Sequence, residues 1–235
     1  MPESSRRLVV ARRLVVAIDG PAGAGKSTTA RLLAQRLGYA LVDTGAIYRT
    51  MALLAHRRGI SWSDGPAVAA LGAALDIHFQ LRGERNHTLL DGADISDEIR
   101  TPEISDGASK VSALPEVRAA LLELQRRLGA AGGVVVEGRD IGTVVFPGAE
   151  AKFFLTASPE ERARRRAAEL RAAGHIVDEA QTRAEMAARD QRDSTRATAP
   201  LRKADDAVEI DSSALDAEGV VDRMAAIVAE RTRAS

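Results

Sequence analysis

Residues 20–27 of the chain are Gly20-Pro21-Ala22-Gly23-Ala24-Gly25-Lys26-Ser27, and Thr28 follows them. They match the pattern G-x-x-x-x-G-K-[ST] of a phosphate-binding loop, or P-loop. Glycines allow the backbone to wrap around a phosphate chain with its N–H groups facing the anion, and a helix N-terminus adds partial positive charge. We therefore expect residues 20–28 to bind the phosphates of a nucleoside triphosphate. Lys26 would reach the β- and γ-phosphates, and the Ser27 hydroxyl would ligate Mg²⁺.

The residues on both sides of this loop predict the strand and the helix that a P-loop requires. Residues 14–18 form a continuous apolar run rich in β-branched side chains, which is typical of a strand buried on both faces of a sheet. Residues 26–37 predict a helix with Leu32, Leu33 and Leu37 on one side. In this context a fortuitous glycine-rich turn is the weaker interpretation.

The rest of the chain alternates between predicted strands and helices, which indicates an α/β fold with a mainly parallel central sheet covered on both faces. Further strands are expected at residues 40–42, 133–136, 151–155 and 207–210. A helix is expected at residues 45–58, and two more begin at about residues 102 and 115. A further pair is expected from 159 to about 171 and from after Gly174 to about 192, and a last helix follows residue 216. Proline and capping side chains, such as those of Thr101-Pro102 and Ser158-Pro159, mark several of these helix starts.

The middle of the chain predicts an insertion into this pattern. Residues 76–81, 87–90 and 93–95 are short alternating segments separated by turn residues, which indicate a small antiparallel unit. We expect one domain at 14–235, with its core at 14–65, 101–157 and 197–235 and the insert at about 66–100. The hexamer Arg-Arg-Leu-Val-Val-Ala occurs twice, at 6–11 and 12–17. Residues 1–13 are therefore expected to be a duplicated extension rather than a targeting signal.

Composition excludes several classes of protein. The 235 residues carry 33 Lys+Arg and 33 Asp+Glu, and a zero net charge argues against binding to nucleic acid by bulk electrostatics. With 3% aromatic residues the chain offers few side chains for base stacking. It has no cysteine, hence no disulfide, thiolate metal site or cysteine nucleophile. No apolar run approaches the roughly 20 residues that span a bilayer. We expect a soluble, cytoplasmic protein without membrane or nucleic-acid partners, and, with no long exposed apolar stripe, a monomer.

A P-loop alone does not define the reaction, and two common classes fit poorly. A GTPase of the usual type needs an Asn-Lys-x-Asp motif, but the single asparagine, Asn86, precedes His87. An ATPase motor needs an apolar strand that ends in a metal-holding acid. The nearest candidate, at residues 133–137, runs directly into Gly138-Arg139-Asp140.

The arginines favour transfer of a phosphoryl group to an acceptor that is itself a phosphate. Such a reaction brings two polyanions together and needs cationic side chains, but no general base, because a phosphomonoester is already mostly dianionic at neutral pH. Arg49 and Arg139 each follow a predicted strand at the ligand end of the sheet. A further cluster comprises Arg162, Arg164, Arg165, Arg166, Arg189, Arg192 and Arg196. For residues 162–166 a solvated helix face, paired with nearby glutamates, is an equally good interpretation.

The sequence resembles the bacterial cytidylate kinases, a family of nucleoside monophosphate kinases. The resemblance extends from about Val15 to the final helix. It rests on residues 18–28, 43–49, 96–101, 108–109, 117–118, 138–147 and 189–201, whose order and spacing agree with the family. The departures are Thr44 where serine is common, Glu137 where aspartate is common, and the extra amino-terminal hexamer. None removes a group that the chemistry needs.

The resemblance implies a P-loop three-layer fold with a small antiparallel insert in the monophosphate-binding (NMP) region and a helical lid at about 158–196. It implies that Lys26, Arg139, Arg189 and Arg196 are catalytic. It also assigns residues to the CMP acceptor. The phosphate would be held by Arg49, Arg139 and Arg196 with Thr44 nearby, the cytosine read by Ser109, Arg118 and Asp140, and the ribose contacted by Arg189 and Asp193.

The expected activity is Mg²⁺-dependent transfer of the γ-phosphoryl group of ATP to CMP or dCMP, in pyrimidine nucleotide metabolism. Asp140 can accept a hydrogen bond from the cytosine N4 amino group and Arg118 can donate to N3 or O2, whereas uracil would leave both badly paired. Two alternatives remain. One is a P-loop kinase for another small acceptor, such as another nucleoside monophosphate, shikimate or dephospho-coenzyme A. The other is a regulatory module that binds nucleotide without transferring phosphate.

Overall fold

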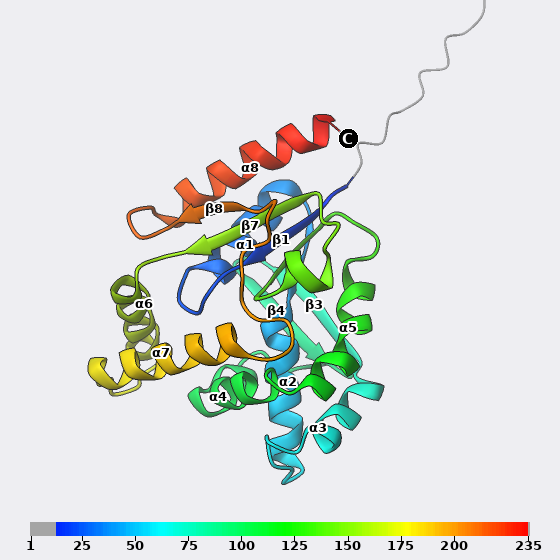
Figure 1. Ribbon diagram of the computed structural model, residues 1–235, viewed down its shortest axis with the longest axis vertical. Coiled ribbons are helices and arrows are strands. Elements are labelled where there is room, and N and C mark those ends of the chain that lie inside the picture. The colour runs from blue at the N-terminus through cyan, green and yellow to red at the C-terminus, as the bar shows by residue number, and fades with distance from the viewer. Residues whose placement is uncertain (1–12, 235) are drawn as a thin grey trace, which may run out of the picture.

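The computed structural model describes residues 13–234. The first copy of the repeated hexamer and nearly all of the expected extension at 1–13 lie outside these residues. The described chain folds into an α/β arrangement with two sheets (Figure 1). The larger sheet has five parallel strands in the order β2-β6-β1-β7-β8, and the smaller has three antiparallel strands in the order β3-β4-β5. The predicted fold class, mainly parallel with an antiparallel insert, is confirmed.

The elements follow one another in the order that the sequence predicts. The strands of the large sheet are β1 (Val15–Asp19), β2 (Ala40–Asp43), β6 (Val134–Gly138), β7 (Ala151–Thr156) and β8 (Val208–Asp211), and those of the small sheet are β3 (Ile77–Arg82), β4 (Arg85–Leu90) and β5 (Ala93–Asp94). The helices are α1 (Lys26–Leu37), α2 (Thr44–Arg57), α3 (Gly65–Leu71), α4 (Pro102–Val111), α5 (Pro115–Gly129), α6 (Pro159–Ala172), α7 (Glu179–Thr195) and α8 (Ala217–Ala234). Short turns are η1 (Gly72–Ala74), η2 (Glu98–Arg100) and the π-helical turn η3 (Ile141–Val145).

The central strand β1 shows why helices cover both faces of the large sheet. Successive side chains of a strand point to opposite faces. Val16 and Ile18 accordingly pack in a core with residues of α1 and α8, while Ala17 packs in a second core with Val136 of β6. A third core joins α2, α3, α4 and α5 to the small sheet. Figure 1 shows α8 beside β8 at one end of the molecule and α3 at the other.

Local capping explains where several helices begin. The Ser158 hydroxyl accepts from the Glu161 backbone N–H at 3.2 Å, and the Thr101 hydroxyl accepts from the Ile104 N–H at 3.3 Å. Asp43 caps α2 through the Ala46 N–H at 3.0 Å, so this helix begins at Thr44 rather than at the expected residue 45.

Four elements were not predicted from the sequence. Helix α3 and the turn η1 precede the antiparallel strands, η2 follows them, and η3 is separated from the end of β6 by two residues. No described helix has an apolar stretch long enough to cross a bilayer.

Candidate active site

The P-loop connects β1 to α1 at the carboxyl edge of the large sheet. Gly20 has φ 148°, and a Cβ atom there would lie 1.9 Å from the carbonyl oxygen of Leu155 in β7. Only glycine therefore fits at this position, directly after β1. Gly25, the residue before the first residue of α1, has φ 90°. The loop backbone can therefore curve around a small anion at the helix N-terminus, as the sequence predicts.

Lys26 is buried under this loop, with 6% of its surface exposed. Its Nζ donates to the Pro21 carbonyl oxygen at 2.6 Å. Burial, followed by the charge of Arg139, holds the pKa of Lys26 well below its usual range. An anion in the loop would remove this cost, because it would supply the charge partner that a buried ammonium group needs.

The Ser27 hydroxyl donates to Glu137 Oε2 at 3.0 Å. Glu137 lies near the end of β6, in register with Asp43 of β2 and Ile18 of β1. Burial, and then the charge of Asp43, raises the pKa of Glu137 to about 7. Carboxylate and hydroxyl oxygens are ligands that suit Mg²⁺, and a Mg²⁺ ion would favour the charged carboxylate.

Among the described residues, no group of three or more His, Cys, Asp or Glu side chains could hold a metal ion. A Mg²⁺ ion near Ser27 and Glu137 would therefore draw its remaining ligands from phosphates and water, as expected in a nucleotide site. Glu137 was missed as a site residue in the sequence analysis. Its position at the end of a buried apolar run was the available signal.

A cleft of about 840 Å³ opens between the P-loop, the helices α2, α4 and α5, and the helix pair α6–α7. Of the predicted P-loop residues, six line it: Ala22, Gly23, Gly25, Lys26, Ser27 and Thr28. Gly20, Pro21 and Ala24 are not among the lining residues. All nine predicted acceptor residues line the same cleft: Thr44, Arg49, Ser109, Arg118, Arg139, Asp140, Arg189, Asp193 and Arg196. The tertiary structure thus brings together residues up to 152 positions apart in sequence, from Thr44 to Arg196.

Asp140 lies between two buried arginines. Its Oδ2 accepts from Arg118, on α5, and its Oδ1 accepts from Arg196 Nη2 at 3.2 Å. Arg196 also donates to the Ala199 carbonyl oxygen at 2.6 Å. Burial, and then the charge of Arg118, lowers the pKa of Arg196. Arg196 was expected to hold the acceptor phosphate, but in this structure its guanidinium group is paired with the residue expected to read the base.

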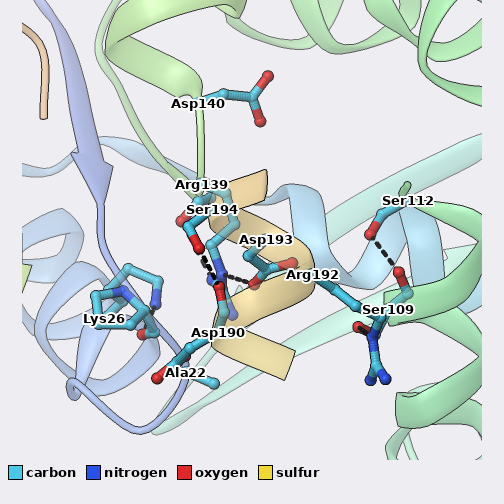
Figure 2. A network of polar contacts seen from close by, with 12 residues as sticks. Ala22, Lys26, Ser109, Ser112, Arg139, Asp140, Asp190, Arg192, Asp193 and Ser194 are labelled. Atoms are coloured by element: carbon cyan, nitrogen blue, oxygen red, sulfur yellow. Dashed lines mark hydrogen bonds and ion pairs between the residues drawn. The ribbon is translucent and has the colours of Figure 1, made fainter. Parts of the chain in front are cut away.

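A second ion pair joins the loop after β6 to helix α7. Arg139 follows β6, and its Nε donates to Asp193 Oδ2, on α7, at 3.0 Å (Figure 2). Arg189 lies one turn earlier on α7, and its buried Nε has no hydrogen-bond partner. Burial, followed by the charge of Arg139, lowers the pKa of Arg189 to about 10. Lys26, Arg139 and Arg189 therefore lie near enough to repel one another, although the carboxylates of Glu137 and Asp193 are also close.

Thr44 and Arg49 belong to the first turns of α2. The Thr44 hydroxyl donates to the Glu137 carbonyl oxygen at 2.7 Å, and Arg49 Nη2 lies 2.7 Å from Asp43 Oδ2. Although burial opposes it, the Arg49 guanidinium group and the Ala46 N–H hold the pKa of Asp43 below its usual range. The Arg49 Nε is buried without a partner. Arg49 thus retains a donor for a ligand in the cleft.

Ser109, on α4, contacts helix α7 directly. Its hydroxyl accepts from Arg192 Nε at 3.2 Å, and Arg192 Nη2 lies 3.4 Å from Asp106 Oδ1. Figure 2 shows Arg192 reaching from α7 toward Ser109. The sequence analysis placed Arg192 in the arginine cluster without assigning it a contact.

For the arginines of α6 the sequence left open whether they form a solvated helix face or belong to the site, and the structure shows both arrangements. Arg164 and Arg166 pair with Glu161 and Glu169 on the same helix, as on a solvated face. Arg162 is buried instead, since it pairs with Asp190 of α7 at 2.6 Å and donates to the Ala22 carbonyl oxygen of the P-loop at 3.1 Å.

A P-loop at the carboxyl edge of a parallel sheet, facing a cleft lined with buried arginines, defines a P-loop phosphotransferase of the α/β class. The chain belongs to the cytidylate kinase family, whose model matches residues 16–230. A cytidylate kinase of Syntrophotalea carbinolica is 54% identical over 220 residues, which cover 94% of each chain. A cytidylate kinase of Geobacter sulfurreducens is 54% identical over 224 residues, covering 95% of this chain and 96% of that one. One solved structure, an uncharacterized protein from Eubacterium ventriosum, shares the fold with a TM-score of 0.50 at 13% identity, covering 93% of this chain and 99% of that one.

Proposed function

We propose that the protein catalyses the Mg²⁺-dependent transfer of the γ-phosphoryl group of ATP to CMP or dCMP, giving ADP and CDP or dCDP. The observation that carries the proposal is the group formed by Lys26, Arg139 and Arg189. Burial depresses the pKa of Lys26 and of Arg189, and the charge of Arg139 depresses both further. A cleft that buries cationic side chains, although burial and mutual repulsion disfavour their charged forms, is suited to binding a polyanion.

The chain's own groups would act by positioning and by charge neutralisation. The P-loop N–H groups and Lys26 would hold the triphosphate, while Arg49 and Thr44 would hold the acceptor phosphate. Arg139 and Arg189, between the two sites, would stabilise the charge that develops during transfer. Arg196 would join them if the acceptor phosphate displaced it from Asp140. No general base is required, because the acceptor phosphate is already an oxyanion at neutral pH. Mg²⁺, held near Ser27 and Glu137, would neutralise phosphate charge.

The group around Asp140 supports selectivity for cytosine. Arg118 and Arg196 hold the Asp140 carboxylate in place before any base binds. Asp140 would accept from the N4 amino group, Arg118 would donate to N3 or O2, and Ser109 would complete the contact. Uracil presents a carbonyl oxygen at position 4, and two acceptors facing each other in a buried site are costly.

Asp193 and Arg189 are proposed to contact the ribose. Asp193 is held by Arg139 through one carboxylate oxygen, Oδ2, which leaves Oδ1 for a sugar hydroxyl. Because the two residues lie on the lid helix α7, sugar contact and lid closure would occur together. Closure would also exclude water from the reacting phosphates and restrict ATP hydrolysis.

We propose the domain organisation that the sequence predicts. An extension at 1–13 would precede one domain at 14–235, with the core at 14–65, 101–157 and 197–235, the NMP insert at about 66–100 and the lid at about 158–196. The support is that the helix pair α6–α7 lies within the lid range and carries Arg189 and Asp193. We further propose a cytoplasmic monomer whose partners are small nucleotides rather than nucleic acid or membranes.

A coupled assay of ADP formation tests the function. Purified protein with ATP and Mg²⁺ is given CMP, dCMP, UMP, AMP, shikimate or dephospho-coenzyme A in separate reactions. We expect turnover with CMP and dCMP and little with the others. Turnover of UMP or AMP at the rate of CMP would overturn the assignment of the base-reading residues, and ATP binding without consumption in any reaction would favour a regulatory module.

A further inference from the structure

Asp19 is the last residue of β1 and directly precedes the P-loop, and only 4% of its surface is exposed. Its carboxylate contacts a different part of the site. Oδ1 accepts from the Ile141 backbone N–H at 2.7 Å, and Oδ2 accepts from the Gly142 backbone N–H at 2.7 Å. Both oxygens of one buried side chain are thus bonded to two consecutive peptide groups 122 and 123 residues away.

These peptide groups follow Arg139 and Asp140, the residues proposed to hold the acceptor. Strand β6 pairs with β1 only as far as Asp19 and Gly138. Beyond that point the backbone leaves the sheet, with Asp140 at φ −147° and ψ 26°, and enters the turn η3. The first N–H groups of a helical turn have no partner within the turn. The Asp19 carboxylate supplies the partner for two of them.

The space around this contact is tight and buried. A Cβ atom on Gly142 would lie 3.4 Å from Asp19 Oδ2 and 3.2 Å from the side chain of Lys152. Burial raises the pKa of Asp19 to about 6, although both N–H bonds act against that rise. A carboxylate is therefore kept at a position where burial disfavours it, and its hydrogen bonds to residues 141 and 142, together with the charge of Lys26, offset part of the cost.

We propose that Asp19 is a positioning residue for the acceptor. It holds the backbone after Arg139-Asp140 in a fixed relation to the P-loop, which begins at the next residue, Gly20. The donor phosphates and the acceptor are thereby aligned through a single side chain. The inference rests on the proposed function, because it takes Arg139 and Asp140 to be acceptor-binding residues.

The variant Asp19→Asn tests this role. An asparagine amide offers one oxygen acceptor, and its NH₂ group would face an N–H donor at the second position. Loss of one charge-assisted hydrogen bond corresponds to about tenfold in an equilibrium. We expect KM for CMP to rise by about this factor, the preference for CMP over UMP to fall, and KM for ATP to change less than about twofold. A purely structural role would affect ATP and CMP alike, so equal losses for both substrates would overturn the proposal.

A second variant keeps the test valid if Asp19→Asn does not fold. Gly142→Ala places a methyl group in contact with the same carboxylate, 3.4 Å from Asp19 Oδ2, and closer to the Lys152 side chain at 3.2 Å, and it removes no charge. It should raise KM for CMP and lower the CMP-to-UMP preference, with ATP again little affected. The matched control is Asp64→Asn, because Asp64 also accepts a backbone N–H, from Ala67 at 3.1 Å, but caps α3 outside the cleft. The control should behave as the wild type.

Hydrogen exchange separates this inference from the proposed function. Amides 141 and 142 should exchange faster in Asp19→Asn, and their protection can be measured whatever the substrate is. If the wild-type protein does not phosphorylate CMP, the proposed function fails on its own. If CMP is phosphorylated but exchange at residues 141 and 142 and the KM for CMP are unchanged in Asp19→Asn, the positioning role is wrong.

Discussion

The Arg139 Nε donates to Asp193 Oδ2 at 3.0 Å, so the loop after β6 is paired with helix α7. Burial lowers the pKa of Lys26 beneath the P-loop and of Arg189 on α7, and the charge of the same Arg139 guanidinium group lowers both further. Arg139 therefore influences both the P-loop lysine and helix α7. A bound polyanion would relieve the repulsion among these three cations.

Lys26→Ala should abolish phosphoryl transfer. Removing one preorganised charge from a transition state costs on the order of 10² to 10³ in kcat. The unfolding temperature should be unchanged or higher at neutral pH, because burial disfavours the Lys26 ammonium group. The coupled assay and a thermal melt measure the two effects. Lys203→Ala serves as the control, since Lys203 pairs with Glu209 at the surface. Retention of more than about a tenth of the wild-type kcat in Lys26→Ala would contradict the role of this residue.

Asp140→Ala should impair CMP turnover far more than ATP binding. The substitution removes the proposed partner of the N4 amino group and leaves Arg118 and Arg196 buried without their shared carboxylate. Breaking such a buried pair costs about 3–5 kcal/mol of stability, so the unfolding temperature should also fall.

Calorimetric titration with an unreactive ATP analogue separates the two effects of Asp140→Ala. Measured below the unfolding transition, the variant should bind the analogue within about threefold of the wild type, which is less than 1 kcal/mol. Asp97→Ala, which removes an exposed partner of Arg85, is the control. Equal losses of analogue and CMP binding would rule out a base-reading role.

Glu137→Gln should stabilise the fold at high pH while lowering activity. The folded-state pKa of about 7 lies above the ordinary value of 4.5, so the buried carboxylate increasingly destabilises the fold as the pH rises from about 4.5 to about 7. Below about pH 4.5 the group is protonated in both the folded and the unfolded chain, and glutamine resembles the neutral acid. We expect a gain of several degrees in Tm at about pH 8.5 that shrinks as the pH falls and vanishes at about pH 4.

Activity should fall in Glu137→Gln because a neutral amide is a poorer partner for Mg²⁺ near Ser27. Thermal melts across pH and titration of activity with Mg²⁺ measure the two effects. The control is Glu123→Gln, because the Glu123 side chain is mostly exposed and does not line the cleft. A gain in Tm that is the same at both pH values would contradict the raised pKa of Glu137.

Arg192→Ala should weaken lid closure. Arg192 bonds Ser109 and approaches Asp106 on α4, and partly exposed contacts of this kind are worth about 0.5–1 kcal/mol. We expect a rise of a few-fold in the ratio of ATP hydrolysis to CMP phosphorylation, since a lid that opens more often admits water. Arg183→Ala, an exposed arginine on the same helix, is the control. An unchanged ratio in Arg192→Ala would show that the contact with α4 does not govern closure.

Local sequence was sufficient to predict most of the elements, and the reason is physical. The P-loop, the buried strand before it and the capped helices after Thr101 and Ser158 are specified by neighbouring residues, whose backbone preferences and hydrogen bonds act over a few positions. Helix α3 was missed because its seven residues carry only a short apolar pattern. The turn η3 was missed because its first N–H groups are satisfied by Asp19, which is far away in the sequence.

The residues that line the cleft could likewise be predicted from the sequence only in part. The types of residue, many arginines and a P-loop lysine, could be read from the chain, and resemblance to the family indicated which of them face the acceptor. The pairing of those residues was decided by the fold, because it depends on distances between strands and helices that are not neighbours in sequence. Arg196 with Asp140, Ser27 with Glu137 and Arg162 with Asp190 are examples. Burial and neighbouring charges then shift the pKa of these groups, and both arise only once the sheet and the helices have packed around the cleft.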